Sequence, residues 1–293
     1  MVGDIHGRAD LLFRLHKMID YDRRSHEANA QSIEIYLGDY CDRGPDSRRV
    51  IDAILERVSR GRKIICLLGN HEQLLLDFLR DPDCGPQWFD KGGTATLESY
   101  GVTAPAGAIG DADLARLSRL LDKAIPDEHK RFLGQLSLMY EVGDYLFVHA
   151  GLKPGREIRD QVASDLISIR REFVKSRADH PKVVVHGHSF YRKPVVGRRH
   201  IGIDTGAFAN GALTALVLHG QSHRFLTARA RARGVSLGDA QIPRSLAGGG
   251  RGPGAAATDV SEVDARRFGQ HPPEESPMKS AVACTFRTMD LVR

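Results

Sequence analysis

The sequence predicts an α/β protein in which two mixed β-sheets pack as a sandwich flanked by helices, with an active site at the carboxyl ends of the strands. Three observations predict this. Strand-like and helix-like segments alternate over residues 8–72, short strand-like segments recur between 182 and 229, and polar residues stand directly after the strand-like runs. Alternation of this kind is typical of a parallel or mixed sheet covered by helices.

The first half of the chain gives the clearest alternation. Apolar residues recur at helical spacing over 8–24 and again over 47–60, and each segment is followed by a strand-like run. The first run, 32–40, alternates Ile33, Ile35 and Leu37 before Gly38, and the second, 63–72, is continuously apolar up to Gly69. We therefore expect two strands that lie side by side with helices against them.

The second half predicts further helices and a second sheet. Helices are expected near 111–124 and 126–136, then a hairpin over 138–151 that turns at Gly143 and Asp144, then one helix around 165–174. Four short strand-like segments follow, separated by turn residues, and they predict a second sheet that is largely antiparallel. These segments are 182–189, 198–207, 211–220 and 223–229.

Composition limits the class of protein. The chain has 293 residues, and we expect one domain over 1–230 and a Gly/Pro/Ala-rich, disordered tail over 231–293. The net charge of +5 comes from 42 basic and 37 acidic residues spread along the chain, so no nucleic-acid partner is expected. No apolar stretch approaches the ~20 residues of a membrane span, so no membrane partner is expected. The four cysteines form no CxxC pair and indicate reduced thiols, so a cytoplasmic location is expected.

Polar side chains follow three strands of the predicted first sheet. Asp4 and His6 come at the start of the chain, Asp39 and Asp42 follow the next strand, and Asn70 with His71 follows the third. In open α/β sheets, ligands bind in the crevice beyond the carboxyl ends of the strands. We expect these side chains to converge there.

Carboxylates, an amide and imidazoles without thiolates suit a hard to borderline divalent cation. Six such groups exceed the needs of one tetrahedral site, so two metal ions with one bridging carboxylate are predicted. Mn²⁺ is the expected ion, with iron or zinc as alternatives. The predicted metal ligands are Asp4, His6, Asp39, Asn70, His149 and His188.

Five motifs resemble those of the calcineurin-like metallophosphoesterases. They are GDIHG at 3–7, GDYCDRG at 38–44, GNHE at 69–72, HAG at 149–151 and GHS at 187–189. Within that group the chain is most similar to the phosphoprotein phosphatases, particularly the small bacterial serine/threonine type, over roughly 3–218. The segments 92–101 and 203–216 also resemble the bacterial branch.

The resemblance implies a role for each motif residue. It implies that Asp4 and His6 hold one metal, that Asp39 bridges, and that Asn70, His149 and His188 hold the other. It further implies that His71 is the general acid and Asp42 orients it, and that Arg43, Arg170 and Asn70 bind the substrate phosphate. Arg170 matches a Trp-Ile-Arg segment of bacterial relatives, with Ser168 in place of the Trp.

The function implied is hydrolysis of phosphoserine and phosphothreonine in a phosphorylated protein or peptide, by direct attack of a metal-bridging hydroxide. Two alternatives remain open. Symmetrical bis(5'-nucleosyl)-tetraphosphatases resemble this group but lack the second aspartate of GDxxDRG, so Asp42 favours the phosphomonoesterase. A catalytically silent scaffold that binds phosphoproteins would have lost ligands or the acid, whereas this chain keeps them all.

Three further residues receive structural interpretations. His186 shares a strand face with His188, and it is expected to be packed or to support the site rather than to bind metal. Trp88 is expected in the core, and Cys41 is expected to be a spacer because nothing near it in the sequence would activate a thiolate.

The start of the sequence departs from the family pattern. Only Met1 and Val2 precede Gly3, where the family has a full central strand. Loss of that strand would leave sheet hydrogen bonds unpaired. The sequence thus predicts either a start further upstream or a destabilised form with altered metal affinity at Asp4 and His6.

Overall fold

The computed structural model describes residues 1–26, 31–105, 109–220 and 222–230. Its first sheet consists of two strand pairs joined through Val2, which bridges in parallel to Tyr36 and antiparallel to Ala215. One pair is parallel and the other is an antiparallel hairpin, so the sheet is mixed. The parallel pair is β1 (Ile33–Tyr36) with β2 (Lys63–Cys66), and the hairpin is β8 (Ala212–His219) with β9 (Ser222–Arg229).

The second sheet has five strands in the order β3, β4, β5, β7, β6. The pairs β4/β5 and β5/β7 are parallel, while the two outer pairs are antiparallel. This confirms the prediction of two mixed sheets. The strands are β3 (Met139–Val142), β4 (Tyr145–Val148), β5 (Val183–His186), β6 (Val195–Val196) and β7 (His200–Gly202).

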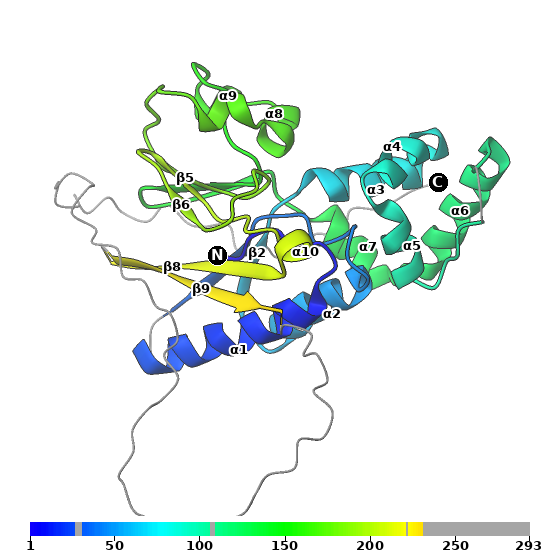
Figure 1. Cartoon of the computed structure of the whole chain (residues 1–293), viewed down its shortest axis with the longest axis horizontal. Helices are drawn as coiled ribbons and strands as arrows, with labels where there is room; N and C mark the ends of the chain where they lie inside the picture. The colour runs from blue at the N-terminus through cyan, green and yellow to red at the C-terminus, as the bar shows by residue number, and fades with distance from the viewer. Residues whose placement is uncertain (27–30, 106–108, 221, 231–293) are drawn as a thin grey trace, which may run out of the picture.

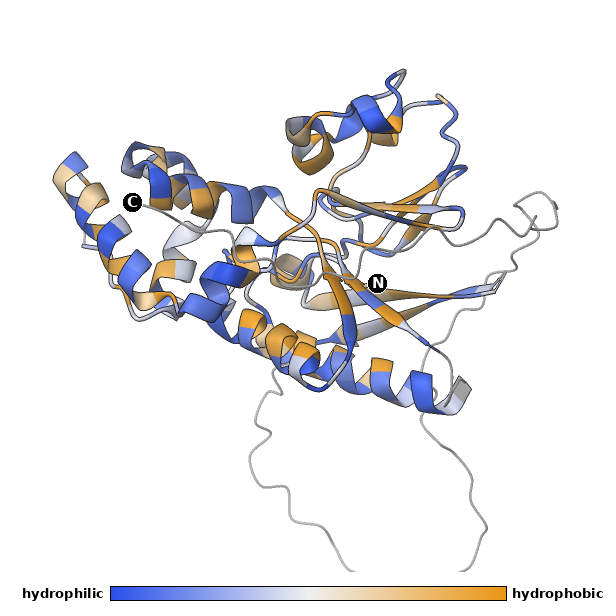
Figure 2. Cartoon of the chain, turned by 180° about the vertical axis from the view of Figure 1, so that it is seen from behind, coloured by the Kyte–Doolittle hydropathy of each residue, from blue (hydrophilic) through white to orange (hydrophobic). Residues whose placement is uncertain are grey.

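The two sheets pack face to face over a common apolar layer. Ile35 and Leu216 of the first sheet share this layer with Phe147 and Val185 of the second. Figure 2 shows the strands as predominantly apolar, as expected for strands with both faces covered.

Helices cover the outer faces of the sandwich (Figure 1). α1 and α2 lie under the first sheet, where α1 contacts β8 and β9, and α8 and α9 lie over the second sheet around Phe173. A lobe of helices from α3 to α7 extends to one side. The helices are α1 (Ala9–His26), α2 (Ser47–Ser59), α3 (Asn70–Arg80), α4 (Gly85–Asp90), α5 (Gly93–Ser99), α6 (Asp111–Ala124), α7 (Asp127–Gly134), α8 (Ala163–Ser168), α9 (Arg171–Val174) and α10 (Ala207–Asn210).

The prediction that the four last strand segments form one largely antiparallel sheet is wrong, although β8 and β9 do pair antiparallel. β5 and β7 pair in parallel inside the second sheet, whereas β8 and β9 leave it and complete the first sheet beside Val2. Alternating apolar residues identify a strand but carry no information about its partner, which is set by contacts distant in sequence.

The single helix predicted around 165–174 is also wrong. The structure has two short helices, α8 and α9, interrupted at Ile169 and Arg170. Arg170 has φ −130° and ψ −102°, far from helical values, and its Nε lies 2.9 Å from His188 Nε2. The interruption turns Arg170 toward the strand ends.

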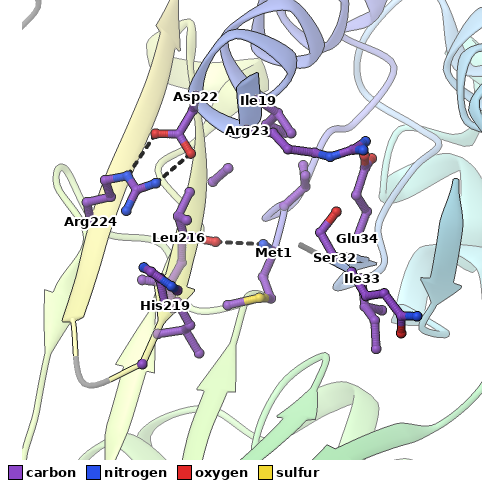
Figure 3. Close-up of a pocket in the computed structure, with 16 residues that line it drawn as sticks. Met1, Ile19, Asp22, Arg23, Ser32, Ile33, Glu34, Leu216, His219 and Arg224 are labelled. Carbon is purple, nitrogen blue, oxygen red and sulfur yellow. Dashed lines mark hydrogen bonds and ion pairs between the residues drawn. The ribbon is translucent and has the colours of Figure 1, made fainter. Parts of the chain in front are cut away.

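The beginning of the chain occupies the position where the family pattern has a strand. Val2 N–H donates to Ile35 O at 2.7 Å, and the Met1 amino group donates to Leu216 O at 2.6 Å. Figure 3 shows this contact inside a pocket of about 270 Å³, next to the ion pair between Asp22 and Arg224. None of the predicted site residues lines this pocket.

A buried polar network joins α1 to β1. His16 Nε2 lies 2.8 Å from the Tyr36 hydroxyl, which donates to Glu34, and Arg57 donates to both Glu34 and Asp20. Burial, and secondarily the charge of Arg57, lower the pKa of His16 to about 3. His16 is therefore neutral in the folded protein near neutral pH.

The pKa of His16 makes stability dependent on pH. An unfolded chain binds a proton at this residue below about pH 6.5, whereas the folded chain does so only near pH 3, so its contribution is lost as pH falls through that window. As pH decreases, we expect the free energy of unfolding to fall less steeply in His16→Gln than in the wild type. The two slopes should differ by up to about 1.4 kcal/mol per pH unit. Urea titrations with chelator at several pH values between 6.5 and 4 measure this, and parallel slopes for the two proteins would contradict it.

Among the described helices, none combines the length and the apolar character needed to cross a membrane. The cytoplasmic location stays a prediction. The tail predicted over 231–293 lies outside the described residues.

Candidate functional site

Left-handed backbone is concentrated at the strand ends. Among the described residues, the non-glycine residues with positive φ are His6, Asp39, Asp42, Arg43 and His188. All of them belong to the predicted site. Such conformations cost free energy for residues with a side chain, and they cluster where the surrounding structure forces a functional geometry.

Glycines in the motifs allow the loops to approach one another. Gly7 has φ +62°, and a side chain there would collide with the backbone of Gly44. Gly38 has φ +102°, and a side chain there would come within 2.8 Å of His149 Nδ1. Close approach of this kind requires glycine, which explains its place in the motifs.

Asp39 is the centre of the site. Its Oδ2 lies 3.4 Å from His6 Nε2, and its Oδ1 lies 3.4 Å from His149 Nε2, so each oxygen faces a different histidine. Burial opposes ionisation, but the surrounding histidines, led by His149 and His71, outweigh burial and hold the pKa of Asp39 below its ordinary value. Asp39 is therefore an anion with two separate histidine neighbours.

Two of the histidines beside Asp39, His6 and His149, are held by the backbone. His6 Nδ1 lies 3.0 Å from Cys41 O, and His149 Nδ1 lies 2.7 Å from Leu37 O. Burial lowers the pKa of His149 and lowers that of His6 to about 3. An Nδ1–H bonded to a carbonyl leaves the Nε2 lone pair for a metal, which is the usual orientation of histidine ligands.

His188 and Asn70 complete the side of Asp39 that faces His149. Asn70 Oδ1 lies 3.2 Å from His149 Nε2. His188 Nε2 lies 3.2 Å from Ser168 O, and in the tautomer that donates to this oxygen Nδ1 has the lone pair available to a metal. Burial, and then the neighbouring His149, lower the pKa of His188 to about 3.

Of the groups of side chains among the described residues that could hold a divalent ion, two share Asp39. One group contains His6 and His71 with Asp39, and the other contains His149 and His188 with Asp39. We assign His71 to a separate role, because its Nδ1 is bound to the buried carboxylate of Asp42, as the motif resemblance implies for the general acid.

Asp4 fits the first group in its place. Its Oδ2 accepts the His188 N–H at 2.9 Å, while its Oδ1 is buried and has no partner among the described residues. A buried carboxylate oxygen without a donor is costly, and a cation would satisfy it. The pKa of Asp4 is raised by burial and by the charges of Asp204 and Asp39, as expected of clustered carboxylates.

His71 and Asp42 form a buried pair. His71 Nδ1 lies 2.6 Å from Asp42 Oδ2, and the two side chains are 1% and 0% exposed. Burial alone would lower the pKa of His71, but Asp39 and Asp42 outweigh it and the net shift is upward. In the structure Nε2 accepts a hydrogen bond from Arg43, whereas the protonated ring, which the upward pKa shift favours, carries a hydrogen on Nε2 as well.

Sequence reasoning missed the residues that hold Asp42. Trp88 is in the core as predicted, but its Nε1 also donates to Asp42 at 3.0 Å, and Thr96 Oγ1 donates to the same carboxylate at 2.6 Å. The segment 92–101, which contains Thr96, resembles the bacterial branch. That resemblance was the one sequence feature that pointed to a role for Thr96. No short-range pattern connects Trp88 to Asp42.

Glu72 was missed as well. Its buried carboxylate accepts the backbone N–H groups of Asp39, Tyr40, Cys41 and Gly69 at 2.8–3.2 Å. It thereby fixes the GDYCDRG loop against GNHE. Burial, and then the charge of Asp39, raise the pKa of Glu72 to about 7.

The remaining predicted residues lie at the mouth or behind the site. Arg43 Nη2 lies 3.1 Å from His71 Nε2, and Arg43 and Arg170 are both exposed on opposite sides of Asp39's histidines. His186 is buried against Phe173 and His200, in agreement with the packed interpretation. Burial raises the pKa of the Cys41 thiol, so it is no activated nucleophile.

The sequence of this chain matches the family model for calcineurin-like phosphoesterases over residues 1–225. An asymmetrical bis(5'-nucleosyl)-tetraphosphatase, PrpE, of Geobacillus sp. strain WCH70 is 26% identical over 233 residues, covering 73% of this chain and 88% of that protein. The zinc-dependent endopolyphosphatase of Saccharomyces cerevisiae is 32% identical over 165 residues, covering 53% of this chain and 47% of that protein.

A solved structure described provisionally as a diadenosine tetraphosphatase has a similar fold. Its TM-score is 0.53 at 23% identity, and the alignment covers 78% of this chain and 91% of that one. The likeness supports the fold, including the sandwich and the helices around it.

Proposed function

The chain belongs to the calcineurin-like phosphoesterases, and from that membership we propose that it is a two-metal hydrolase that cleaves nucleoside polyphosphates. The observation that carries the chemistry is Asp39, with one carboxylate oxygen 3.4 Å from His6 and the other 3.4 Å from His149. A carboxylate that faces two ligand sets with different oxygens is suited to bridge two cations.

The site residues have separate roles in metal binding, phosphate binding and proton donation. Asp4 and His6 would hold one ion with Asp39, and Asn70, His149 and His188 would hold the other. Bound divalent ions would neutralise phosphate charge and lower the pKa of a water molecule. Arg43 and Arg170 bind and orient the phosphate oxygens, for which a planar guanidinium is well suited. His71, oriented by Asp42, donates a proton from Nε2 to the leaving oxygen.

The substrate class is supported by the relatives. The tetraphosphatase relatives match over 88% of their own length, and the yeast relative is an endopolyphosphatase. Both names describe cleavage within a phosphoanhydride chain. We therefore place phosphoanhydride substrates first.

Phosphoserine and phosphothreonine in proteins are the second candidate. The observation that favours them is the buried His71–Asp42 pair. A serine or threonine alkoxide is a poor leaving group that must be protonated, whereas a nucleotide phosphate leaves as a stabilised anion. Hydrolysis of a phosphomonoester therefore depends more on an oriented general acid than hydrolysis of a phosphoanhydride does.

The test compares substrates on the full chain reconstituted separately with Mn²⁺ and Zn²⁺. We expect metal-dependent turnover that EDTA abolishes, with kcat/KM for diadenosine tetraphosphate about tenfold or more above that for a phosphoserine peptide. Product analysis separates ATP plus AMP, the asymmetrical outcome, from two ADP.

Each alternative has its own result. A higher kcat/KM on the phosphopeptide would reverse the order of the two candidates, and two ADP would indicate symmetrical cleavage. Phosphopeptide binding without turnover of any substrate, p-nitrophenyl phosphate included, would identify a silent scaffold.

A further inference from the structure

We infer that Phe208 and Phe190 form an aromatic platform at the rim of the site, on which the nucleobase of the substrate stacks. This inference rests on the proposed function, because it places the base of a nucleoside polyphosphate whose phosphates lie at Asp39. Both rings are partly open to solvent, with Phe208 46% and Phe190 49% exposed.

Phe208 lies beside the phosphate-binding groups. Its ring centroid is 5.4 Å from the Arg43 guanidinium carbon and 6.3 Å from the His6 ring, which meets it edge to face. Arg43 in turn reaches His71 at 3.1 Å. A planar group on the open part of the Phe208 ring would therefore lie next to a phosphate held by Arg43.

Phe190 lies two residues after His188 in the loop that follows β5. Its ring rests against Gly206, where an added side chain would come within 2.5 Å of Phe190 Cε2. Phe190 and Phe208 thus flank the same glycine turn, one toward His188 and the other toward His6. The exposed cations Arg192 and Lys193 follow in the loop that carries Phe190.

The turn that carries Phe208 is held in place. Arg8 Nη1 donates to Ala207 O at 2.8 Å, and Asn210 N–H donates to Gly206 O at 2.7 Å. Thr205 Oγ1 donates to Ala212 O at 2.9 Å and closes the turn onto β8. A turn fixed in this way needs little backbone reordering when a ligand stacks on Phe208.

The chemistry of the rim favours a nucleobase. Every base has a flat π-face that stacks on an aromatic ring, and an adjacent arginine strengthens the stack. The cations of the Phe190 loop suit a substrate with more phosphate than one monoester carries. A phosphoserine side chain offers no planar group to either ring.

The experiment measures selectivity between substrates with and without a base. The ratio of kcat/KM for diadenosine tetraphosphate to kcat/KM for inorganic tripolyphosphate is determined for Phe208→Leu, Phe208→Trp and Phe190→Leu. We expect the ratio to fall about tenfold in Phe208→Leu and several-fold in Phe190→Leu, and Phe208→Trp to stay within about twofold of the wild type.

Phe13→Leu is the matched control. Phe13 is also an exposed phenylalanine, 37% exposed, with the guanidinium carbon of Arg49 5.4 Å from its ring centroid. It lies on α1 outside the site, so its ratio is expected to equal that of the wild type.

Binding gives a second readout that needs no turnover. Calorimetry with AMP is expected to show about tenfold weaker binding in Phe208→Leu, while binding of inorganic phosphate changes much less than binding of AMP. Equal losses for AMP and phosphate, equal losses for both polyphosphates, or the same loss on a phosphopeptide would overturn the platform.

Failure of the proposed function is distinguishable from failure of the platform. If the wild type cleaves neither polyphosphate, the proposed function fails whatever the variants do, and AMP binding alone then decides on the platform. Absence of AMP binding to the wild type would overturn the platform too.

Discussion

Replacement of Asp39 by asparagine is expected to remove metal binding and activity together. Asp39 faces both histidine sets, with one oxygen 3.4 Å from His6 and the other 3.4 Å from His149. An amide carries no charge, and its nitrogen presents donors where a cation needs a lone pair. We expect metal affinity to fall by more than about 100-fold and kcat/KM by about 10³-fold or more.

The measurement is metal content by mass spectrometry after dialysis, together with kcat/KM at saturating metal. Asp122→Asn serves as the control, because it also removes one carboxylate, 58% exposed and paired with Lys130 on the helical lobe. An Asp39→Asn protein that keeps two ions per chain and full activity would refute the bridging assignment.

Replacement of His71 by asparagine is expected to lower kcat by about 10²- to 10⁴-fold on a substrate with an alkoxide leaving group. The change removes the proton donor and leaves Asp4, His6, Asn70, His149 and His188 in place. Metal content should therefore stay at the wild-type value, and the loss should appear in kcat rather than in KM.

The leaving group provides an internal control for His71. A nitrophenolate leaves with little assistance, so the effect on p-nitrophenyl phosphate should be much smaller than the effect on a phosphoserine peptide. Equal losses on the two substrates would show that His71 supports the site in another way, and a loss of metal would place it among the ligands.

The predicted site could be located from sequence because its residues follow strand ends. Short-range patterns identify where a strand stops, and parallel strands bring their carboxyl ends together, so Asp39 and Asn70 had to be neighbours. His149 and His188 are distant in sequence but also follow strand-like runs, and the motif resemblance then implied that they hold the second metal.

Two features of the fold, the sheet to which β8 and β9 belong and the break at Arg170, could not be predicted because they depend on contacts between residues distant in sequence. β8 and β9 belong to the first sheet only because Val2 bridges to Ala215, a contact across more than two hundred residues. The break at Arg170 arises where the chain must turn toward His188, whereas the periodicity of 165–174 fits one helix. In both places tertiary contacts outweigh local preference.

The residues that support the site could not be predicted from the sequence, because their contacts with it are also distant in sequence. Trp88 and Thr96 reach Asp42 from α4 and α5, and neither stands at a strand end. Nothing in the sequence distinguishes Phe208 from other apolar residues. Its exposure beside Arg43 in the structure is what suggests that it contacts a ligand. Substrate choice therefore could not follow from the motifs alone.

The left-handed backbone of His6, Asp39, Asp42, Arg43 and His188 limits how heat-resistant this enzyme can become. Each such residue costs on the order of 1–3 kcal/mol, which glycine would relieve. Yet every one of these positions carries a side chain that has a role in the proposed function. Selection for thermal tolerance alone would thus erode turnover first, and variants that survive heating best should be sought in the helical lobe instead.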